Sequence, residues 1–379
     1  MGATEQKPNW SELVFLWQPW NSCLNLATWA ASLCLAMTLT GSAATVLAFY
    51  LVFIVIYDIL YYGYKFSIID ENGTLRQGYN LSYLIDDAGS ALGGGLDYGF
   101  NYYNGNFKKD RIQAQQDKFD FCYQQLGLQA GMTVIDCGCG CGDWLNYLRT
   151  RGVTGIGINI TPAQVKVCRE RGLTVLLTDW KLIGGNAEFE KQLYGKADAV
   201  TCWDTIEHYV PSKCRTSVAQ QDAIYTQLFQ LIQKFLSPDS KVGRTWTSCL
   251  HYGSIGKSHW MTRSYNDYLL DKFHSGCYPD YSTRQLTQNA KRAKFTQIME
   301  KNLTEDYYMT SVLCPNHFGR HKHTLTFYRA VALSLVVLLD PNWLQRFLWM
   351  NQEAWMDQFD AKKLEDSPMQ LLWIMWERN

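Results

Sequence analysis

The sequence predicts an α/β protein with a Rossmann-like, mostly parallel sheet, preceded by an N-terminal pair of membrane-spanning helices. Its central stretch is a short apolar run, Met132 to Ile135, followed by alternating glycines and cysteines and then by a helix-like segment. Further apolar runs alternate with helix-like segments downstream, which is typical of parallel sheets. Residues 13–57 contain no Asp, Glu, Lys or Arg. We therefore divide the chain into a membrane-attachment region, 1–64, and an α/β domain, 65–379.

Composition narrows the class of protein. The formal net charge is zero, so the chain lacks the basic excess of a nucleic-acid-binding protein, and we expect no nucleic-acid partner. Aromatic residues reach 14%, which suits a protein that meets lipid or holds an apolar substrate. The 12 cysteines do not form the framework of a small secreted domain, so we expect reduced thiols in a cytosol-facing domain. The composition does not specify an oligomeric state.

Two apolar spans in the uncharged region predict a transmembrane hairpin. Cys23 to Leu39 and Ala44 to Leu60 are separated by a break of small residues, and each is long enough to cross a bilayer, which takes roughly 17–25 residues. Trp and Tyr cluster at the outer ends of the spans, as in interfacial belts. A hairpin returns the chain to its starting side, leaving the rest cytosolic and attached to the membrane. The alternative is a buried helical pair within a soluble protein.

Ahead of the first strand, residues 65–110 are expected to form loops and short helices, and Gln113 to Leu126 an amphipathic helix.

The glycine-rich stretch after the first strand predicts a ligand-binding loop. A strand, a glycine loop and a helix bring backbone N–H groups close to a ligand. The spacing Gly-x-Gly-x-Gly, without a following Lys-Ser/Thr, favours S-adenosylmethionine over a dinucleotide. The alternating cysteines have no second pair, so we expect them to pack behind the loop and expect no metal.

The next elements follow in alternation. Residues 155–160, 173–177 and 197–202 are predicted as the second, third and fourth strands. Thr161 and Pro162 are start signals for a helix from Ala163 to Arg171. Polar residues follow the carboxyl end of each strand, and open α/β sheets bind their ligands at that edge.

The C-terminal third predicts two antiparallel edge strands. Asp306 to Leu313 is expected to be the sixth strand of the sheet and Gln370 to Trp376 the last. Between them, residues 327–339 and 342–350 are apolar and aromatic, and are expected to form either a helical lid for an acyl chain or part of the core.

Several ordered motifs together carry a family resemblance. They are Leu96-Asp97-Tyr98-Gly99-Phe100-Asn101-Tyr102-Tyr103, Ala114-Gln115-x-x-Lys118, the glycine loop, Gly157-x-x-x-Thr161-x-x-Gln164, Ile206-Glu207-His208, Leu250-His251 with Ile255-Gly256, the segment from Asp271 to Pro279, and Thr324-Leu325-x-x-Tyr328. From about Tyr79 onward the chain resembles the cyclopropane-fatty-acid-synthase branch of class I S-adenosylmethionine-dependent methyltransferases. That resemblance implies a seven-stranded sheet and the sulfonium cofactor. Sphingolipid C9-methyltransferases of this branch also carry N-terminal membrane spans.

Cofactor contacts are expected at the ends of the strands. Asp179 can accept a hydrogen bond from the adenine amino group and Trp180 can stack on the ring. The resemblance gives the ribose contacts to Asn159 and Gln164, and places Tyr98 over the cofactor. The full expected set is Tyr98, Gly99, Asp136, Gly138, Gly140, Gly142, Asn159, Gln164, Asp179 and Trp180.

Glu207, His208 and His251 form the expected chemical site. Methyl transfer to an alkene leaves a carbocation, and a base must then remove a proton. The resemblance implies a bicarbonate ion as that base, held in part by Glu207 and the segment at His251. Two residues depart from the family pattern: Phe100 stands where the family has a Cys, and His321 where it has a Tyr. The spacing after His251 is also longer than in the family. The base is therefore bicarbonate in an altered cradle, or Glu207 or a His acting directly.

Three functions remain open from the sequence. The first is a membrane-attached methyltransferase acting on carbon of an unsaturated lipid or fatty acyl chain, by C-methylation or cyclopropanation. The second is an amine N-methyltransferase of the same family, with a small-molecule substrate. The third is an inactive lipid-binding scaffold, which the intact glycine loop and the Glu207-His208 pair disfavour.

Overall fold

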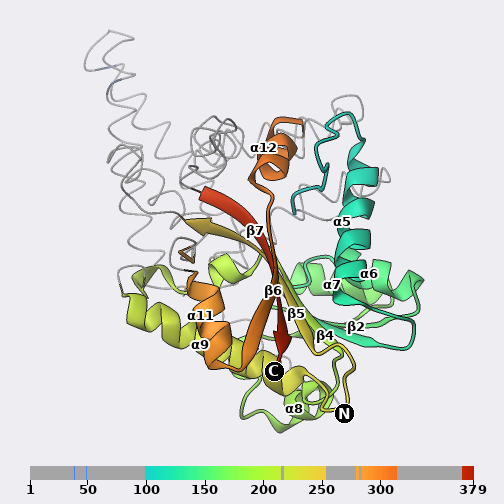
Figure 1. Ribbon diagram of the computed structural model, residues 1–379, viewed down its shortest axis with the longest axis vertical. Helices are drawn as coiled ribbons and strands as arrows, with labels where there is room; N and C mark the ends of the chain where they lie inside the picture. Colours follow the sequence, from blue (N-terminus) through green and yellow to red (C-terminus); the bar gives the residue numbers. More distant parts are fainter. Residues whose placement is uncertain are drawn as a thin grey trace.

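The computed structural model describes residues 38, 48, 99–214, 217–252, 279–280, 284–313 and 369–379, and the structural statements below concern these residues. They form one seven-stranded sheet flanked by helices (Figure 1). The helices and strands, in chain order, are α5 (Arg111–Leu126), β1 (Thr133–Cys137), α6 (Asp143–Thr150), β2 (Thr154–Asn159), α7 (Pro162–Glu170), β3 (Thr174–Leu177), η1 (Trp180–Leu182), α8 (Ala187–Leu193), β4 (Ala199–Trp203), η2 (Ile206–His208), η3 (Ser212–Cys214), α9 (Val218–Phe235), β5 (Arg244–Tyr252), α11 (Gln285–Arg292), β6 (Phe295–Asn302), α12 (Thr304–Leu313) and β7 (Met369–Arg378).

The strand order is β3-β2-β1-β4-β5-β7-β6. Strands β1 to β5 run parallel, and β7 is inserted antiparallel between β5 and β6. The chain proceeds from β1 outward to β3 and then returns to place β4 on the other side of β1. In open α/β sheets this reversal leaves a crevice at the carboxyl ends of the two central strands. The fold therefore places its ligand site where β1 and β4 end.

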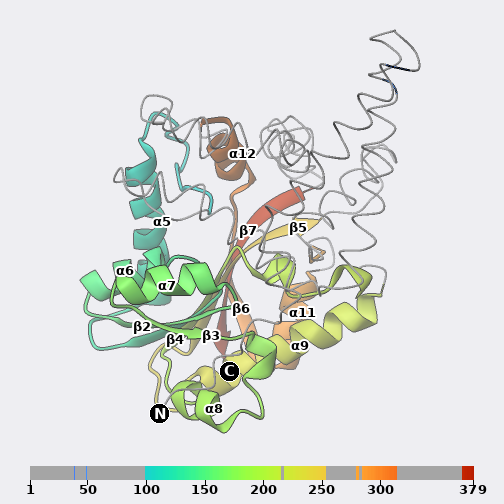
Figure 2. The ribbon, with the colours of Figure 1, turned by 180° about the vertical axis from the view of Figure 1, so that it is seen from behind.

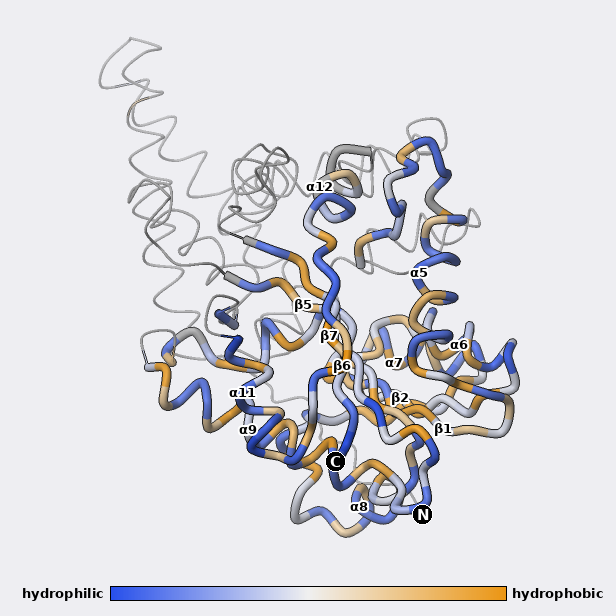
Figure 3. Tube along the Cα trace, in the orientation of Figure 1, coloured by the Kyte–Doolittle hydropathy of each residue, from blue (hydrophilic) through white to orange (hydrophobic). Residues whose placement is uncertain are grey.

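Helices cover both faces of the sheet. In Figures 1 and 2, α9 and α11 lie on one side and α5, α6 and α7 on the other. The first side buries an aliphatic and aromatic core that includes Phe229, Phe235 and Trp376. The second buries Trp246 and Trp373 against residues of α5 and α6. Figure 3 shows hydrophobic and hydrophilic residues alternating along α5, as expected for a helix that packs one face on the sheet.

Most of the predicted core elements are confirmed, but the predicted sixth strand is wrong. Residues 306–313 belong to helix α12, and the sixth strand is β6, ahead of it. Glu305 and Asp306 lie in the first turn of α12, where acidic side chains favour a helix. Asp306 Oδ1 also accepts hydrogen bonds from the backbone N–H groups of Tyr103 (2.6 Å) and Asn104 (2.9 Å). This long-range contact, which the local sequence does not reveal, fixes the helix against the segment before α5.

The predicted N-terminal spans and the aromatic pair at 327–350 lie outside the described residues, apart from the single positions 38 and 48. Within the described part of the chain, no helix is both long enough and apolar enough to cross a membrane. The domain boundary at residue 64 also falls outside that part. These expectations therefore stay predictions.

Candidate active site

The glycine loop between β1 and α6 needs glycine at each of its three positions, for different reasons. Gly138, Gly140 and Gly142 all have positive φ, at 88°, 53° and 82°. A Cβ on Gly138 would lie 2.3 Å from Thr205 Cγ2, and one on Gly142 2.5 Å from Leu173 Cδ1. A Cβ on Gly140 would meet no atom within 4 Å. The outer glycines are thus required by packing, whereas Gly140 borders open space at the carboxyl edge of the sheet.

Hydrogen bonds from neighbouring elements hold the loop in place. The backbone N–H groups of Gly138 and Cys139 both donate to the carbonyl of Ile158 on β2, at 2.8 and 3.2 Å. The guanidinium of Arg171 donates to the carbonyl of Cys141 at 2.7 Å and pairs with Asp143 at 2.7 Å. Because these contacts come from β2 and from the end of α7, the loop is preorganised by the folded sheet.

Three residues expected to meet the cofactor contact one another. Asn159 Nδ2 donates both to the carbonyl of Gly140 and to Gln164 Oε1, each at 3.0 Å, while Asn159 Oδ1 accepts from the Thr161 N–H. Both amide hydrogens of Asn159 are therefore used within the protein. Gln164 Nε2 makes no hydrogen bond to the described residues, which leaves it as a donor for a ligand. Asn159 therefore orients both the glycine loop and the side chain of Gln164.

Asp136 joins the two central strands. Its Oδ1 accepts a hydrogen bond from the hydroxyl of Thr201 on β4 at 2.8 Å, and that hydroxyl in turn accepts from Trp144 Nε1 at 3.2 Å. Asp136 is buried, so the strand-end acid contributes to the frame beneath the loop.

The polar pair expected to hold adenine lies after β3. Asp179 Oδ1 accepts from the Lys181 N–H at 3.0 Å and so caps η1. Trp180 is buried, and its ring centroid lies 5.3 Å from that of Tyr209. Both residues stand at the carboxyl edge, beside the strand that carries Asn159.

Glu207 stands on η2, directly after β4. Two residues before it, the hydroxyl of Thr205 donates to the Cys137 carbonyl at 3.0 Å, so η2 touches the strand that leads into the glycine loop. Glu207 is 3% exposed, and its Oε2 has no hydrogen-bond partner within the described structure. Burial, and secondarily the nearby Asp204 carboxylate, raise the pKa of Glu207 to about 8. His208 is half-buried next to it.

His251 lies near the end of β5. It is 1% exposed, and burial, with a smaller contribution from the positive charge of Arg284, lowers its pKa to about 3. The imidazole is therefore neutral at physiological pH, and suited to accept or donate a hydrogen bond rather than to carry charge. The carboxyl of Glu207 contacts the thiol of Cys249 and the backbone of Leu250, so the structure brings Glu207 to the segment that immediately precedes His251.

Two expected site residues, Tyr98 and His321, fall outside the described structure. Gly99 is the first residue of the continuous described stretch 99–214, and the following residue is a core aromatic. Phe100 is 2% exposed, and its ring centroid lies 5.7 Å from that of Trp373. The position at which the resembled family has a Cys therefore carries a packed ring in this chain.

Sequence reasoning misses Asp204, which follows β4 and precedes η2. It is one of four described non-glycine residues with positive φ, at 48°. Its backbone N–H donates to the Ser248 carbonyl at 2.8 Å, and its Oδ1 accepts from the Ser248 hydroxyl. The one available signal in the sequence is an acid at a strand end, three residues before Glu207.

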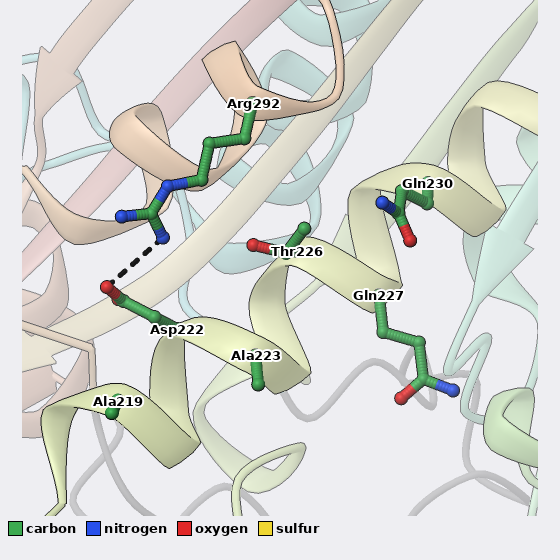
Figure 4. A pocket seen from close by; sticks show the side chains of 7 residues that line it. All are labelled: Ala219, Asp222, Ala223, Thr226, Gln227, Gln230 and Arg292. Atoms are coloured by element: carbon green, nitrogen blue, oxygen red, sulfur yellow. Dashed lines mark hydrogen bonds and ion pairs between the residues drawn. The ribbon is translucent and has the colours of Figure 1, made fainter.

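A separate groove of about 410 Å³ lies between α9 and α11 (Figure 4). Its charged side chains pair with each other or with a neighbour, since Asp222 accepts from Asn289 Nδ2 at 3.0 Å and from Arg292 at 3.2 Å. None of its lining residues belongs to the strand ends. No group of three or more His, Cys, Asp or Glu side chains within the described residues could hold a metal ion.

Residues 92–331 match the family described as mycolic acid cyclopropane synthetase. The chain belongs to this family. Over 232 residues it is 25% identical to the cyclopropane-fatty-acyl-phospholipid synthase of Escherichia coli K12, a match that covers 57% of this chain and 52% of the relative. Over 115 residues it is 30% identical to the methoxy mycolic acid synthase MmaA3 of Mycobacterium tuberculosis, which covers 27% and 36% of the two chains. The first match thus spans about half the length of the relative.

Solved structures share the fold. The cyclopropane synthase MmaA2 from Mycobacterium tuberculosis superposes with a TM-score of 0.59 at 16% identity, covering 80% of this chain and 97% of that one. The mycolic acid cyclopropane synthase CmaA1, solved with SAH and CTAB, gives 0.58 at 15% identity, covering 82% and 100%. These likenesses confirm the class I methyltransferase fold with its seven-stranded, mostly parallel sheet.

Proposed function

We propose that this protein is an S-adenosylmethionine-dependent methyltransferase that acts on an unsaturated lipid or fatty acyl chain, by C-methylation or cyclopropanation. Two features at the carboxyl ends of the central strands carry the proposal. One is the open space beside Gly140, just after β1, and the other is the buried acid Glu207, just after β4. Membership of the mycolic acid cyclopropane synthetase family supports it. Its relatives, which include a cyclopropane-fatty-acyl-phospholipid synthase, support the substrate class.

The residues around the loop fit this cofactor. Gly140 offers the space for close approach. Gln164, whose Oε1 accepts from Asn159 Nδ2, would turn its Nε2 toward the ribose hydroxyls. Asp179 and Trp180 would serve the adenine at the neighbouring strand end, and Tyr98 would close over it. When bound, the cofactor supplies an electrophilic methyl group on a sulfonium ion.

Glu207 is the proposed proton acceptor. Methyl transfer to an alkene leaves a positive charge on the substrate, and loss of a proton from that cation completes the reaction. A carboxyl with one unpartnered, buried oxygen and a pKa near neutrality is matched to this task. The same oxygen fits a bicarbonate ion, which would be held by Glu207 and the neutral His251. Phe100 and His321 would leave that cradle different from the one in the resembled family.

We also propose that the protein is attached to a membrane. The uncharged stretch from 13 to 57 would attach the chain to a membrane as a helical hairpin, with the catalytic domain on the cytosolic side. A membrane-attached enzyme would meet acyl chains in the bilayer itself.

An amine N-methyltransferase is the second candidate. The adjacent acids Asp204 and Glu207 favour it, because a pair of carboxyls suits a substrate that carries or develops positive charge. Phe100, in place of the family Cys, is also compatible with a site that does not use bicarbonate.

The test is a reaction of the full-length protein with methyl-labelled S-adenosylmethionine and vesicles of phospholipid. We expect label in phospholipids with unsaturated acyl chains and none in otherwise identical saturated ones. Glu207→Gln is the matched catalytic control, since it keeps the shape of the side chain and removes its basicity. Equal labelling of saturated and unsaturated lipid, or transfer to an amine head group alone, would overturn the assignment to the acyl chain.

A further inference from the structure

Residues 99–103 form a short strap that lies between α5 and α12 (Figures 1 and 2). On one side, the backbone N–H of Tyr102 donates to the carbonyl of Ala114 on α5 at 3.1 Å. On the other side, the N–H of Asn101 donates to Thr310 Oγ1 on α12 at 2.9 Å. The backbone of the strap is therefore fastened to a helix on each side.

Lys118 lies one turn after Ala114 on α5 and is only 1% exposed. Lysine is almost never fully buried unless its charge has partners. The Lys118 ammonium lies 5.6 Å from the centre of the Phe100 ring in the strap and 5.4 Å from that of Trp203. A third ring, that of Phe119 on the same helix, lies 5.0 Å away. An ammonium within about 6 Å of a ring centre is attracted to the face of the ring, most strongly where water is excluded.

The rings of Phe100 and Trp203 belong to two different parts of the candidate site. Phe100 directly follows Tyr98 and Gly99, which are expected to meet the cofactor. Trp203 is the last residue of β4, and the proposed base Glu207 follows it by four positions. One buried cation thus attracts both the strap and the end of the strand that leads to the base.

We propose that Lys118 is a positioning residue, whose ammonium holds the strap against the end of β4 through the rings of Phe100 and Trp203. This inference rests on the proposed function. A strap held in this way keeps Tyr98 where it would cover the cofactor. A loosened strap lowers the fraction of the protein that is ready to bind, and so weakens the apparent affinity. The Ala114-Gln115-x-x-Lys118 motif thereby gains a role, because its first residue holds the backbone of the strap and its last holds a ring.

Calorimetric titration of the full-length protein with S-adenosylmethionine tests the proposal. Lys118→Met keeps an unbranched, flexible side chain that fills the buried space, and it removes the charge. We expect affinity to fall by roughly 5- to 30-fold, which corresponds to the loss of one desolvated cation–π contact. In the lipid-labelling assay, the KM for S-adenosylmethionine should rise in parallel and by more than any change in kcat.

A double-mutant cycle shows whether Lys118 acts through the strap. Phe100→Leu removes the ring and leaves every other contact of the Lys118 ammonium in place, and it should weaken cofactor binding by itself. In that background, Lys118→Met should change affinity by no more than about twofold, because the ring through which it acts is already gone. Phe100→Met, which refills more of the space, takes the place of Phe100→Leu if that variant does not fold.

Lys234→Met is the matched control. The Lys234 ammonium lies 5.5 Å from the centre of the Tyr194 ring, so it makes the same kind of contact. It is exposed, however, and stands near the end of α9, where the Gly195 N–H donates to its carbonyl ahead of β4. This control should leave both affinity and KM unchanged. A thermal melt of each sample shows that the proteins compared are folded.

The outcomes are distinguishable. If the native protein does not bind S-adenosylmethionine, the proposed function is overturned together with this inference. If folded Lys118→Met binds as tightly as the native protein, even with a lower Tm, Lys118 has only a structural role and the inference alone is overturned. An equal loss of affinity from Lys118→Met with and without the Phe100 ring also overturns it, because Lys118 would then act by another route.

Discussion

Replacing Gly140 with alanine separates cofactor binding from folding. The added Cβ would meet no protein atom within 4 Å, so the folded structure has room for it. The remaining cost is the left-handed backbone at φ 53°, roughly 1–2 kcal/mol for an alanine. For a domain of this size that cost corresponds to a fall in Tm of about 2–8 °C. We expect a folded, slightly less stable protein.

The same methyl group would project into the space assigned to the cofactor. Inserting a methyl into a close-packed contact costs about 1–3 kcal/mol, which corresponds to a loss of affinity of roughly 5- to 150-fold. Gly140→Val should extend this to loss of measurable binding. Calorimetric titration with S-adenosylmethionine measures the affinity, and a thermal melt of the same sample measures the stability.

Gly131→Ala is the matched control. Gly131 also has positive φ, at 89°, and a Cβ there would also meet nothing within 4 Å, but it precedes β1 at the opposite edge of the sheet. It should lower Tm without changing affinity. If folded Gly140→Ala binds the cofactor as tightly as the native protein, the loop is not the cofactor cradle and the reasoning is refuted.

Three further predictions follow from the same site and from the N-terminal sequence. Glu207→Gln should lower turnover by about 10²–10⁴-fold, the usual contribution of a general base, while cofactor affinity at pH 6.5 stays near that of the native protein. Turnover equal to that of the native protein would exclude Glu207 as the base. Because folding raises the pKa of Glu207 to about 8, the folded protein holds a proton that the unfolded chain has lost, so this group's effect on stability becomes less favourable as pH rises from about 5 to 8. Melting temperatures of the native protein and Glu207→Gln should diverge over that range in favour of the variant, and parallel curves would contradict the buried acid. The full-length protein should remain in the membrane pellet after carbonate washing, and its release would rule out the hairpin.

The central part of the fold can be predicted from sequence because its signals are local. The run from Thr133 to Cys137, the glycines after it and the Thr161-Pro162 start signal each determine their own element. Strand β6 gives a weaker signal: only alternate residues of Phe295–Asn302 are buried, and most of them only partly. The segment after Leu303 reads as a strand because it carries aromatic and β-branched residues, yet it is a helix whose first turn is anchored by Asp306 to Tyr103.

Some residues of the candidate site can also be predicted from local sequence, and others cannot. Gly138, Gly140, Gln164 and Glu207 are recognisable from motif spacing, and the structure places them along one edge of the sheet. Asp204 is not, because its importance comes from contacts with Ser248, a residue 44 positions later. A side chain held by a distant strand leaves no local pattern to detect.

The most direct test of the central claim is the fate of the methyl group in native membranes. Membranes containing the full-length protein would be incubated with methyl-labelled S-adenosylmethionine and extracted into lipid and aqueous fractions, with Glu207→Gln membranes as the background. A lipid acyl-chain methyltransferase predicts that Glu207-dependent label enters the lipid fraction and survives in the fatty acids after the head groups are cleaved. Glu207-dependent label confined to a water-soluble amine would contradict it.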